Sequence, residues 1–278
     1  KRILNTCDQP ENVVRSVSRL LGCKWEDLDP VYFGLNHYGW FTHVYDAHTG
    51  EDLLPKVREM VKEKGFLPQD AEQRDQSWLD TYGMVQTIMA DFPEFLPNTY
   101  DQYYLYPDYK VSHLDPNFTR ADEVMAGREK RVFTECAEVI KEGKLGDKFH
   151  AISDAHAEMM IKVAEAIAYN KNDRHILIVE NNGAIANMQD DAMVEVVCEL
   201  GINGPRPMRV GNIPQFNLGL LVNQVSCEKL IVDAYFENSY QKALEAFTLN
   251  RLINDAKKAR KVLDALIEAN KGMWPELR

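Results

Sequence analysis

The sequence has little of what marks membrane-embedded or secreted chains. No apolar run approaches the roughly 20 residues that a helix needs to span a bilayer, so we expect no membrane partner. The opening segment KRILNTCDQP lacks an apolar region followed by a small-residue cleavage site. The five cysteines are odd in number and scattered, at Cys7, Cys23, Cys136, Cys198 and Cys227. A disulfide framework is therefore not expected, and a reducing, cytoplasmic location is.

Positive charge is also in short supply. The chain has 32 Lys and Arg against 43 Asp and Glu, which gives a formal net charge of -11. A nucleic-acid surface needs clustered cations to neutralise phosphates, so we expect no nucleic-acid partner. A phosphorylated small substrate needs only a few local cations, and it stays open. There is no low-complexity stretch or fixed-period repeat, so a linker or a repeat array is not indicated.

What is present is an ordinary globular composition. The 278 residues are 45% apolar and 27% charged, and this length allows one large domain or two smaller ones. RILNTC at 2–7 predicts a short buried strand, and Pro10 suits the first turn of a helix that ends at Gly22. A strand that passes directly into a helix is half of a parallel α/β unit, which needs neighbouring strands. We therefore expect residues 1–24 to be the end of a sheet that begins in a preceding segment.

The remaining pattern predicts a mixture of short strands and longer helices. Strands are expected at 31–35 and 41–45 (joined by a polar turn at 36–39), 176–179 and 193–198. Helices are expected at 52–64, 76–91, 119–142 and 153–169, and over most of 217–270. Residues 93–107, rich in Pro and Tyr, are expected to be irregular. The sequence thus predicts an α/β remnant followed by an α+β region from 25 to 278.

Cys7 and Asp8 lie where the first predicted strand ends and the first helix begins. Ligands of open α/β sheets bind outside the carboxyl ends of the strands, so this position suits a site. A thiolate binds metals, and a helix N-terminus favours that charged form. The alternative interpretation is a buried structural cysteine beside an aspartate that faces solvent.

Three further residues have suitable chemistry, each with a plainer alternative. His37 lies in a polar turn from which an imidazole could reach a metal, or it could simply bond a nearby carbonyl. Tyr100 could act as a base only if a cation lowered its pKa from about 10, and tyrosines more often serve packing. Arg120 begins a predicted helix, where the macrodipole disfavours a cation. It could bind an anionic or polyhydroxyl partner there, or it could be an ordinary solvated surface arginine.

The glycine-containing turn NNGAIAN at 181–187 follows a predicted strand. It is not a GxGxxG fingerprint, and the chain has no such fingerprint elsewhere. As a phosphate cradle it is weak. A tight turn that fixes the backbone near a cleft or a subunit contact is favoured.

Taken together, these segments resemble glycoside hydrolase family four. The resemblance is carried by CDQP at 7–10, GLNH at 34–37 and NTY at 98–100. The first of these is similar to the 6-phospho-α-glucosidase branch, where Cys-Asp-Met-Pro is usual and Gln9 replaces the methionine. Further matching stretches are TRADEV at 119–124, IVENNGAIAN at 178–187 and IPQF at 213–216.

The resemblance implies the fold and the cofactors. Residues 1–24 would be the remnant of a Rossmann-like, dinucleotide-binding domain. Residues 25–278 would form a mixed, helix-rich metal- and substrate-binding C-terminal domain with a lactate/malate dehydrogenase-like architecture. NAD and Mn²⁺ would be the cofactors, with the main NAD site in a separate N-terminal segment. A homodimer or homotetramer would be the assembly.

The resemblance also implies roles for single residues. Cys7 and His37 would be the metal ligands, Asp8 the general acid and Tyr100 the base. The two substrate-binding residues would be Asn36 and Arg120.

The implied reaction is hydrolysis of 6-phospho-α-glucosides, such as maltose 6′-phosphate, to glucose 6-phosphate. It runs by oxidation, elimination, addition and reduction, and NAD-dependent members of this family are exceptions to hydrolysis by two carboxylates. We expect this chain alone to be inactive. A non-catalytic sugar-phosphate-binding or oligomerisation fragment and a hydroxyacid dehydrogenase relative remain as alternatives.

Overall fold

The computed structural model describes residues 4–74, 76–144, 155–253 and 255–278, and it divides the chain into two compact units. The first unit comprises Lys1–Pro107, Arg174–Glu199 and Pro205–Arg278. The second comprises Asp108–Asp173 and Leu200–Gly204. No helix among the described residues is both long enough and apolar enough to cross a bilayer.

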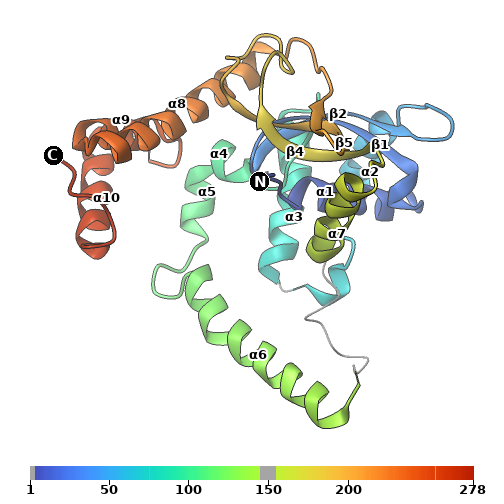
Figure 1. Cartoon of the computed structure of the whole chain (residues 1–278), viewed down its shortest axis with the longest axis horizontal. Coiled ribbons are helices and arrows are strands. Elements are labelled where there is room, and N and C mark those ends of the chain that lie inside the picture. The colour runs from blue at the N-terminus through green and yellow to red at the C-terminus, as the bar shows by residue number, and fades with distance from the viewer. Residues whose placement is uncertain (1–3, 75, 145–154, 254) are drawn as a thin grey trace. The chain divides into compact units, whose positions relative to one another are not determined.

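The first unit contains a β-sheet packed with helices, followed by a helical C-terminal part (Figure 1). Its strands are β1 (Leu28–Leu35), β2 (Tyr38–Asp46), β3 (Leu96–Pro97), β4 (Asp173–Glu180), β5 (Met193–Gly201) and β6 (Gly204–Pro207), of which β4, β5 and β6 reach or cross the boundary with the second unit. Its helices are α1 (Gln9–Leu21), α2 (Leu54–Lys64), α3 (Gln76–Asp91), α4 (Asp101–Leu105), α8 (Gln215–Glu237), α9 (Tyr240–Leu249) and α10 (Ala256–Ala269), with short 3-10 turns at Trp25–Asp27 and Ala71–Gln73.

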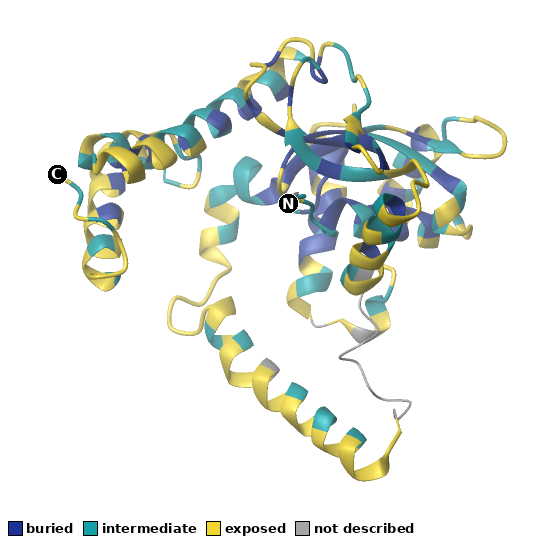
Figure 2. Cartoon of the chain, viewed as in Figure 1, coloured by how far each residue is buried: buried dark blue, intermediate teal, exposed yellow. Residues whose placement is uncertain are grey.

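The second unit contains α5 (Pro107–Ser112), α6 (Arg120–Glu142) and α7 (Ala155–Ala168). Thr119 and Asp122 form a reciprocal capping box at the start of α6, as the sequence predicts. The side chains described along α6 are exposed or half-buried (Figure 2). Its stability in this chain therefore depends mainly on the cap and on local helix propensity.

The sheet runs in the order β3-β2-β1-β5-β4, with β6 paired to β5. The pairs of β1 with β2, of β1 with β5 and of β2 with β3 are all antiparallel. Gly34 lies opposite Gly39, and a Cβ on Gly34 would come within 2.4 Å of the Gly39 Cα atom. Two facing glycines thus let the strands approach closely just before the turn that carries His37.

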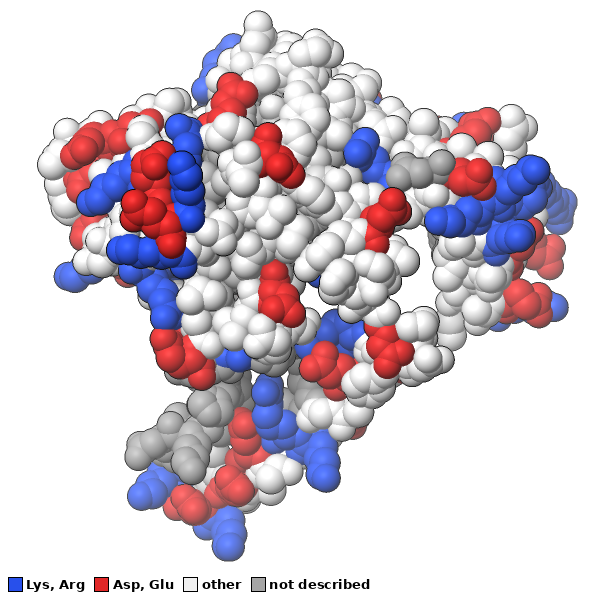
Figure 3. Space-filling model, turned by 180° about the vertical axis from the view of Figure 1, so that it is seen from behind, with Lys and Arg blue, Asp and Glu red and all other residues white. Residues whose placement is uncertain are grey.

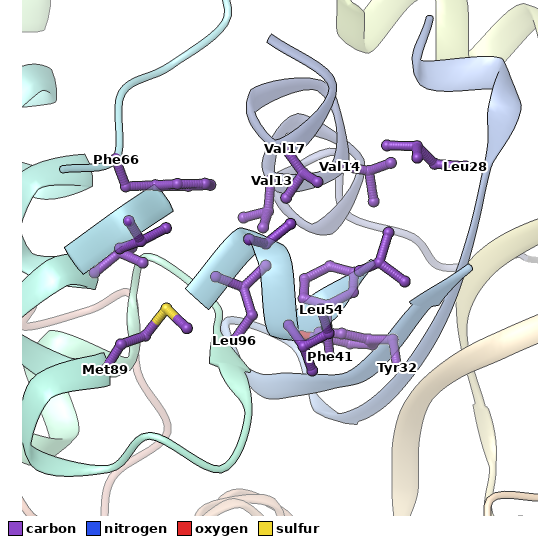
Figure 4. Close-up of a cluster of buried hydrophobic side chains, with 14 of the residues drawn as sticks. Val13, Val14, Val17, Leu28, Tyr32, Phe41, Leu54, Phe66, Met89 and Leu96 are labelled. Atoms are coloured by element: carbon purple, nitrogen blue, oxygen red, sulfur yellow. The ribbon is translucent and has the colours of Figure 1, made fainter. Parts of the chain in front are cut away.

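The core lies between the sheet and the helices α1, α2 and α3 (Figure 4). The apolar residues of α1 recur at helical spacing, so Val13, Val14 and Val17 are all buried on one face. They share a cluster with Tyr32 and Phe41, whose ring centroids are 4.7 Å apart. This packing fixes the N-terminus of α1 relative to the hairpin of β1 and β2.

Most of the predicted elements are confirmed, and the mixed α/β, helix-rich architecture is confirmed with them. The helix predicted at 76–91 is α3, and the first helix ends at Gly22 with a left-handed φ of 72°. The prediction of a strand over 2–7 is wrong for the residues described. Asn5 makes only an isolated antiparallel bridge with Ile178, because no second ladder residue pairs beside it.

The prediction of an irregular segment at 93–107 is also wrong in part. Leu96–Pro97 pairs with β2, and Asp101–Leu105 forms one helical turn and more. Pro97 is accommodated because β3 is short and lies at the edge of the sheet.

Candidate active site

Cys7 and Asp8 lie at the N-terminus of α1. Pro10 fits the first turn of this helix, because the backbone N–H that proline lacks would have no acceptor within the helix there. The Gln9 backbone N–H points at the Cys7 Sγ atom at 3.5 Å. The Asn12 amide donates to Asp8 Oδ2 at 3.0 Å, one helical turn later. The first turn of the helix therefore holds both side chains, Cys7 through a backbone N–H and Asp8 through the Asn12 side chain.

The Cys7 thiol is protonated in these surroundings. Burial raises the pKa of Cys7 to about 12, and the Gln9 N–H opposes this rise. The negative charges of Glu195 and Asp8 raise it further. A bound cation would act in the opposite direction, because a coordinated thiol loses its proton.

His37 occupies the two-residue turn between β1 and β2 with a left-handed φ of 64°. This conformation is uncommon for residues other than glycine, although histidine adopts it more often than most, as asparagine and aspartate do. The imidazole ring centroid lies 4.5 Å from that of Tyr100. Partial desolvation lowers the pKa of His37, while the charge of Asp8 opposes the change. The ring is therefore held in its neutral, metal-binding form near neutral pH.

Tyr100 precedes α4, and its backbone N–H donates to Asn98 Oδ1 at 3.0 Å. Its ring packs between those of His37 and Trp78. Burial raises the pKa of Tyr100 well above its ordinary value, and Tyr103, Cys7 and Asp8 add to the rise. The phenol is a weak base in these surroundings unless a cation offsets them.

Four of the six predicted site residues converge. The charge of Asp8 raises the pKa of both His37 and Tyr100, and the charge of Cys7 raises that of Tyr100. The His37 and Tyr100 rings are in contact. Asn36 is exposed in the same turn as His37. Arg120 lies in the second unit, at the start of α6, and pairs there with Glu123.

Sequence analysis missed a buried polar network beside these residues. Glu195 on β5 is fully buried, and its Oε2 atom accepts the Tyr32 hydroxyl hydrogen at 3.0 Å. The Asn98 amide donates to the same Tyr32 oxygen at 3.3 Å, so the network leads to the segment that carries Tyr100. Burial raises the pKa of Glu195 to about 8, and the Tyr32 hydroxyl opposes the rise. The available signal was a glutamate flanked by valines in the apolar first part of β5.

The turn at 181–187 folds around the buried Asn181. Its amide donates to the carbonyls of Ile185, Met188 and Gln189 at 3.0, 3.3 and 3.1 Å, and its Oδ1 accepts the Ile185 N–H at 2.7 Å. These bonds use the inward polar groups of the turn itself. The segment is a closed turn, in line with the interpretation that the sequence favoured over a phosphate cradle.

The donor set suits an open metal site better than a closed one. Among the described residues, no group of three or more His, Cys, Asp and Glu side chains is arranged to hold a metal ion. Cys7 and His37 offer one sulfur and one nitrogen donor near Tyr100. A metal held by these two side chains would keep coordination positions for oxygen atoms of a substrate or water, as a catalytic metal requires. On the face that Figure 3 shows, acidic and basic side chains lie in mixed groups.

Comparison with known proteins identifies the family of the chain. The model of the family 4 glycosyl hydrolase C-terminal domain matches residues 32–253. A phospho-alpha-glucosidase of Clostridium acetobutylicum is 46% identical over 279 residues, which cover 99% of this chain and 63% of that protein. The chain therefore spans a little under two thirds of the length of this relative.

Solved structures show the same coverage. A 6-phospho-alpha-glucosidase from gut microorganisms, in complex with NAD and Mn²⁺, is 81% identical with a TM-score of 0.95, over 100% of this chain and 63% of that one. A second, from gut microorganisms in complex with NAD and glucose-6-phosphate, is 45% identical with a TM-score of 0.92, over 100% and 63%. With a family model that matches most of its length and relatives of this identity, the chain belongs to glycoside hydrolase family 4.

Proposed function

We propose that this chain is the metal-binding and acid/base part of a 6-phospho-α-glucosidase that requires NAD and Mn²⁺. Its substrate would be a phosphorylated disaccharide such as maltose 6′-phosphate, and its product glucose 6-phosphate. The observation that carries the proposal is the convergence of Cys7, Asp8, His37 and Tyr100 in a family 4 chain. The relatives solved with NAD, Mn²⁺ and glucose-6-phosphate support the choice of cofactors and of sugar.

Cys7 and His37 would hold the metal, leaving positions open for sugar oxygens. When bound, NAD supplies a hydride acceptor for C3 of the glucosyl ring, and Mn²⁺ polarises the oxygens at C2 and C3. Tyr100 would then remove the C2 proton, which a ketone at C3 makes acidic. Asp8 would protonate the departing glycosidic oxygen during elimination. Water would then add across the C1–C2 double bond, which restores a proton at C2, and C3 would recover its hydride from the reduced cofactor.

The electrostatics of Tyr100 agree with a requirement for a cation. Burial and the neighbouring Cys7 and Asp8 hold the phenol in its protonated form. A divalent cation on Cys7 and His37 would lie beside the Tyr100 ring and lower its pKa. The proposed base therefore depends on the proposed metal.

Substrate contacts would come from Asn36, in the turn beside His37, and from Arg120 at the start of α6. We also propose that residues 1–24 belong with the NAD-binding part and residues 25–278 with the C-terminal domain. The family model that matches describes a C-terminal domain, and the relatives extend beyond the matched length. The chain by itself would then lack most of the NAD site and be inactive, and the working enzyme would be a homodimer or homotetramer.

The test is release of glucose 6-phosphate from maltose 6′-phosphate. It compares the chain by itself with the chain joined to the NAD-binding part of an 81% identical relative. The joined protein should act only with both NAD and Mn²⁺ present, and the chain alone should not act. Binding of glucose 6-phosphate without any hydrolysis by the joined protein would instead indicate a sugar-phosphate-binding module. Net formation of NADH without hydrolysis would indicate a dehydrogenase.

A further inference from the structure

Asp101 is a fully buried carboxyl group directly after Tyr100 in the chain. Its Oδ1 atom accepts the backbone N–H of Gly39 at 3.1 Å. Its Oδ2 atom has no hydrogen-bond partner among the described residues. Burying a carboxyl group costs free energy, and the hydrogen bond from Gly39 ties this group to the strand that follows the His37 turn.

The segment that carries Tyr100 binds both the N–H and the carbonyl of Gly39. The Asn98 N–H donates to the Gly39 carbonyl at 2.8 Å, while the Asp101 carboxyl accepts the Gly39 N–H. The Asp101 N–H donates to the Asn98 carbonyl at 3.0 Å, which closes the loop between the two contacts. Residues 98–101 therefore bind both backbone groups of Gly39, one in each of two successive peptide units of β2.

A second contact joins the same two segments. The Tyr38 ring, next to His37 in the chain, stacks on the Tyr104 ring of α4 with 3.9 Å between centroids and 14° between planes. The hydrogen bonds to Gly39 restrain the position of Tyr100 along β2, and the stacking of Tyr38 on Tyr104 restrains the orientation of α4. Both restraints act on the pair of elements whose side chains, His37 and Tyr100, meet at 4.5 Å.

We propose that Asp101 is a positioning residue that locks the His37 turn against the Tyr100 segment through the Gly39 N–H. The proposal rests on the proposed function, in which His37 binds the metal and Tyr100 is the base. Asp101 touches neither substrate nor cofactor. It fixes where the phenol stands relative to the metal ligand, so its loss should affect the rate of the chemical step more than substrate binding.

The test compares Asp101→Ala with Asp101→Asn in the joined protein loaded with NAD and Mn²⁺. Asparagine keeps an oxygen that accepts from Gly39, whereas alanine does not. Asp108→Asn, at an exposed aspartate in α5, is the matched control. We expect Asp101→Ala to lower kcat by about tenfold or more with KM changed by less than about threefold, and Asp101→Asn to restore kcat to within about threefold.

A structural readout accompanies the kinetics. The NMR signals of the His37 ring are recorded on the metal-free protein, because Mn²⁺ is paramagnetic and broadens the signals of nearby nuclei. They are identified by their loss in His37→Gln, and they report the position of the ring beside that of Tyr100. They should move in Asp101→Ala and stay in place in Asp101→Asn and Asp108→Asn. Wild-type kcat in Asp101→Ala, or a kcat loss with unmoved His37 signals, would overturn the proposal.

The two readouts separate the two hypotheses. If the wild-type joined protein releases no glucose 6-phosphate, the proposed function fails, and the His37 signals still test the positioning role. Thermal unfolding confirms that each variant is folded. If Asp101→Ala does not fold, Asp101→Ser takes its place, because its hydroxyl is too short to reach the Gly39 N–H. Unchanged His37 signals in that variant would equally overturn the proposal.

Discussion

Replacing Glu195 with Gln should change how the stability of the chain depends on pH. Glu195 is fully buried, and burial raises its pKa to about 8 from an ordinary value of 4.5. The folded chain therefore keeps this carboxyl protonated across a range of pH in which the unfolded chain ionises it. The folded state binds more protons there, so the free energy of unfolding falls as pH rises from about 4.5 to about 8.

The size of the effect follows from the two pKa values. A pKa raised from 4.5 to about 8 corresponds to a loss of at most about 5 kcal/mol across that range. Below about 4.5 and above about 8 the Glu195 contribution is flat. Glutamine is neutral at every pH, and its carbonyl can still accept the Tyr32 hydroxyl hydrogen at the position of Oε2. The variant should therefore lack this component and gain stability over the wild type as pH rises.

The assay is urea unfolding of the metal-free chain at about pH 5, about pH 6.5 and about pH 9. The difference between Glu195→Gln and wild type should grow by several kcal/mol from the lowest to the highest pH. Glu199→Gln is the matched control on β5, because Glu199 makes a partly exposed ion pair with Arg206, which is worth about 0–1 kcal/mol. Parallel stability profiles for Glu195→Gln and wild type would refute the reasoning.

Two further substitutions test the proposed acid and the buried turn. Asp8→Asn in the joined protein should lower turnover on maltose 6′-phosphate by about 100-fold or more, since general acid catalysis contributes about that much. Calorimetry should show a nearly unchanged Mn²⁺ affinity. Unchanged hydrolysis would show that Asp8 is not the acid. Asn181→Ala should lower the free energy of unfolding by about 2–4 kcal/mol, because it strips partners from buried backbone groups of the turn. The exposed Asn117→Ala is its control, expected within about 0.5 kcal/mol of wild type, and an equally small loss for Asn181→Ala would contradict the role of the turn.

Local sequence patterns predicted most of the secondary structure because neighbouring residues determine where a helix starts, which face it buries and where it ends. Helical spacing of valines defines α1, Gly22 ends it, and Thr119 with Asp122 starts α6. The strand prediction at 2–7 was wrong for the described residues 4–7, because an apolar stretch indicates burial and does not identify the strand that lies beside it. Asn5 meets β4 only at Ile178, a partner far away in the sequence.

The candidate site was predictable only in part. Motifs identified Cys7, Asp8, His37 and Tyr100 one by one, and no spacing along the chain could show that they meet. That meeting depends on the helix N-terminus, the hairpin turn and the start of α4 packing against each other. Glu195 and Asp101 escaped notice because their significance comes from burial and from single hydrogen bonds made across the fold.

The central claim is that Cys7 and His37 form a metal site beside Tyr100 that serves NAD-dependent hydrolysis. The most direct measurement is release of glucose 6-phosphate from maltose 6′-phosphate by the joined protein, with NAD and Mn²⁺ omitted one at a time, for wild type, Cys7→Ser and the exposed-cysteine control Cys23→Ser. We predict that hydrolysis requires both cofactors. Cys23→Ser should act at the wild-type rate, and Cys7→Ser should show a strongly lowered Mn²⁺ affinity and a strongly lowered turnover. Hydrolysis without NAD, or a Cys7→Ser variant with wild-type Mn²⁺ affinity and turnover, would contradict the account.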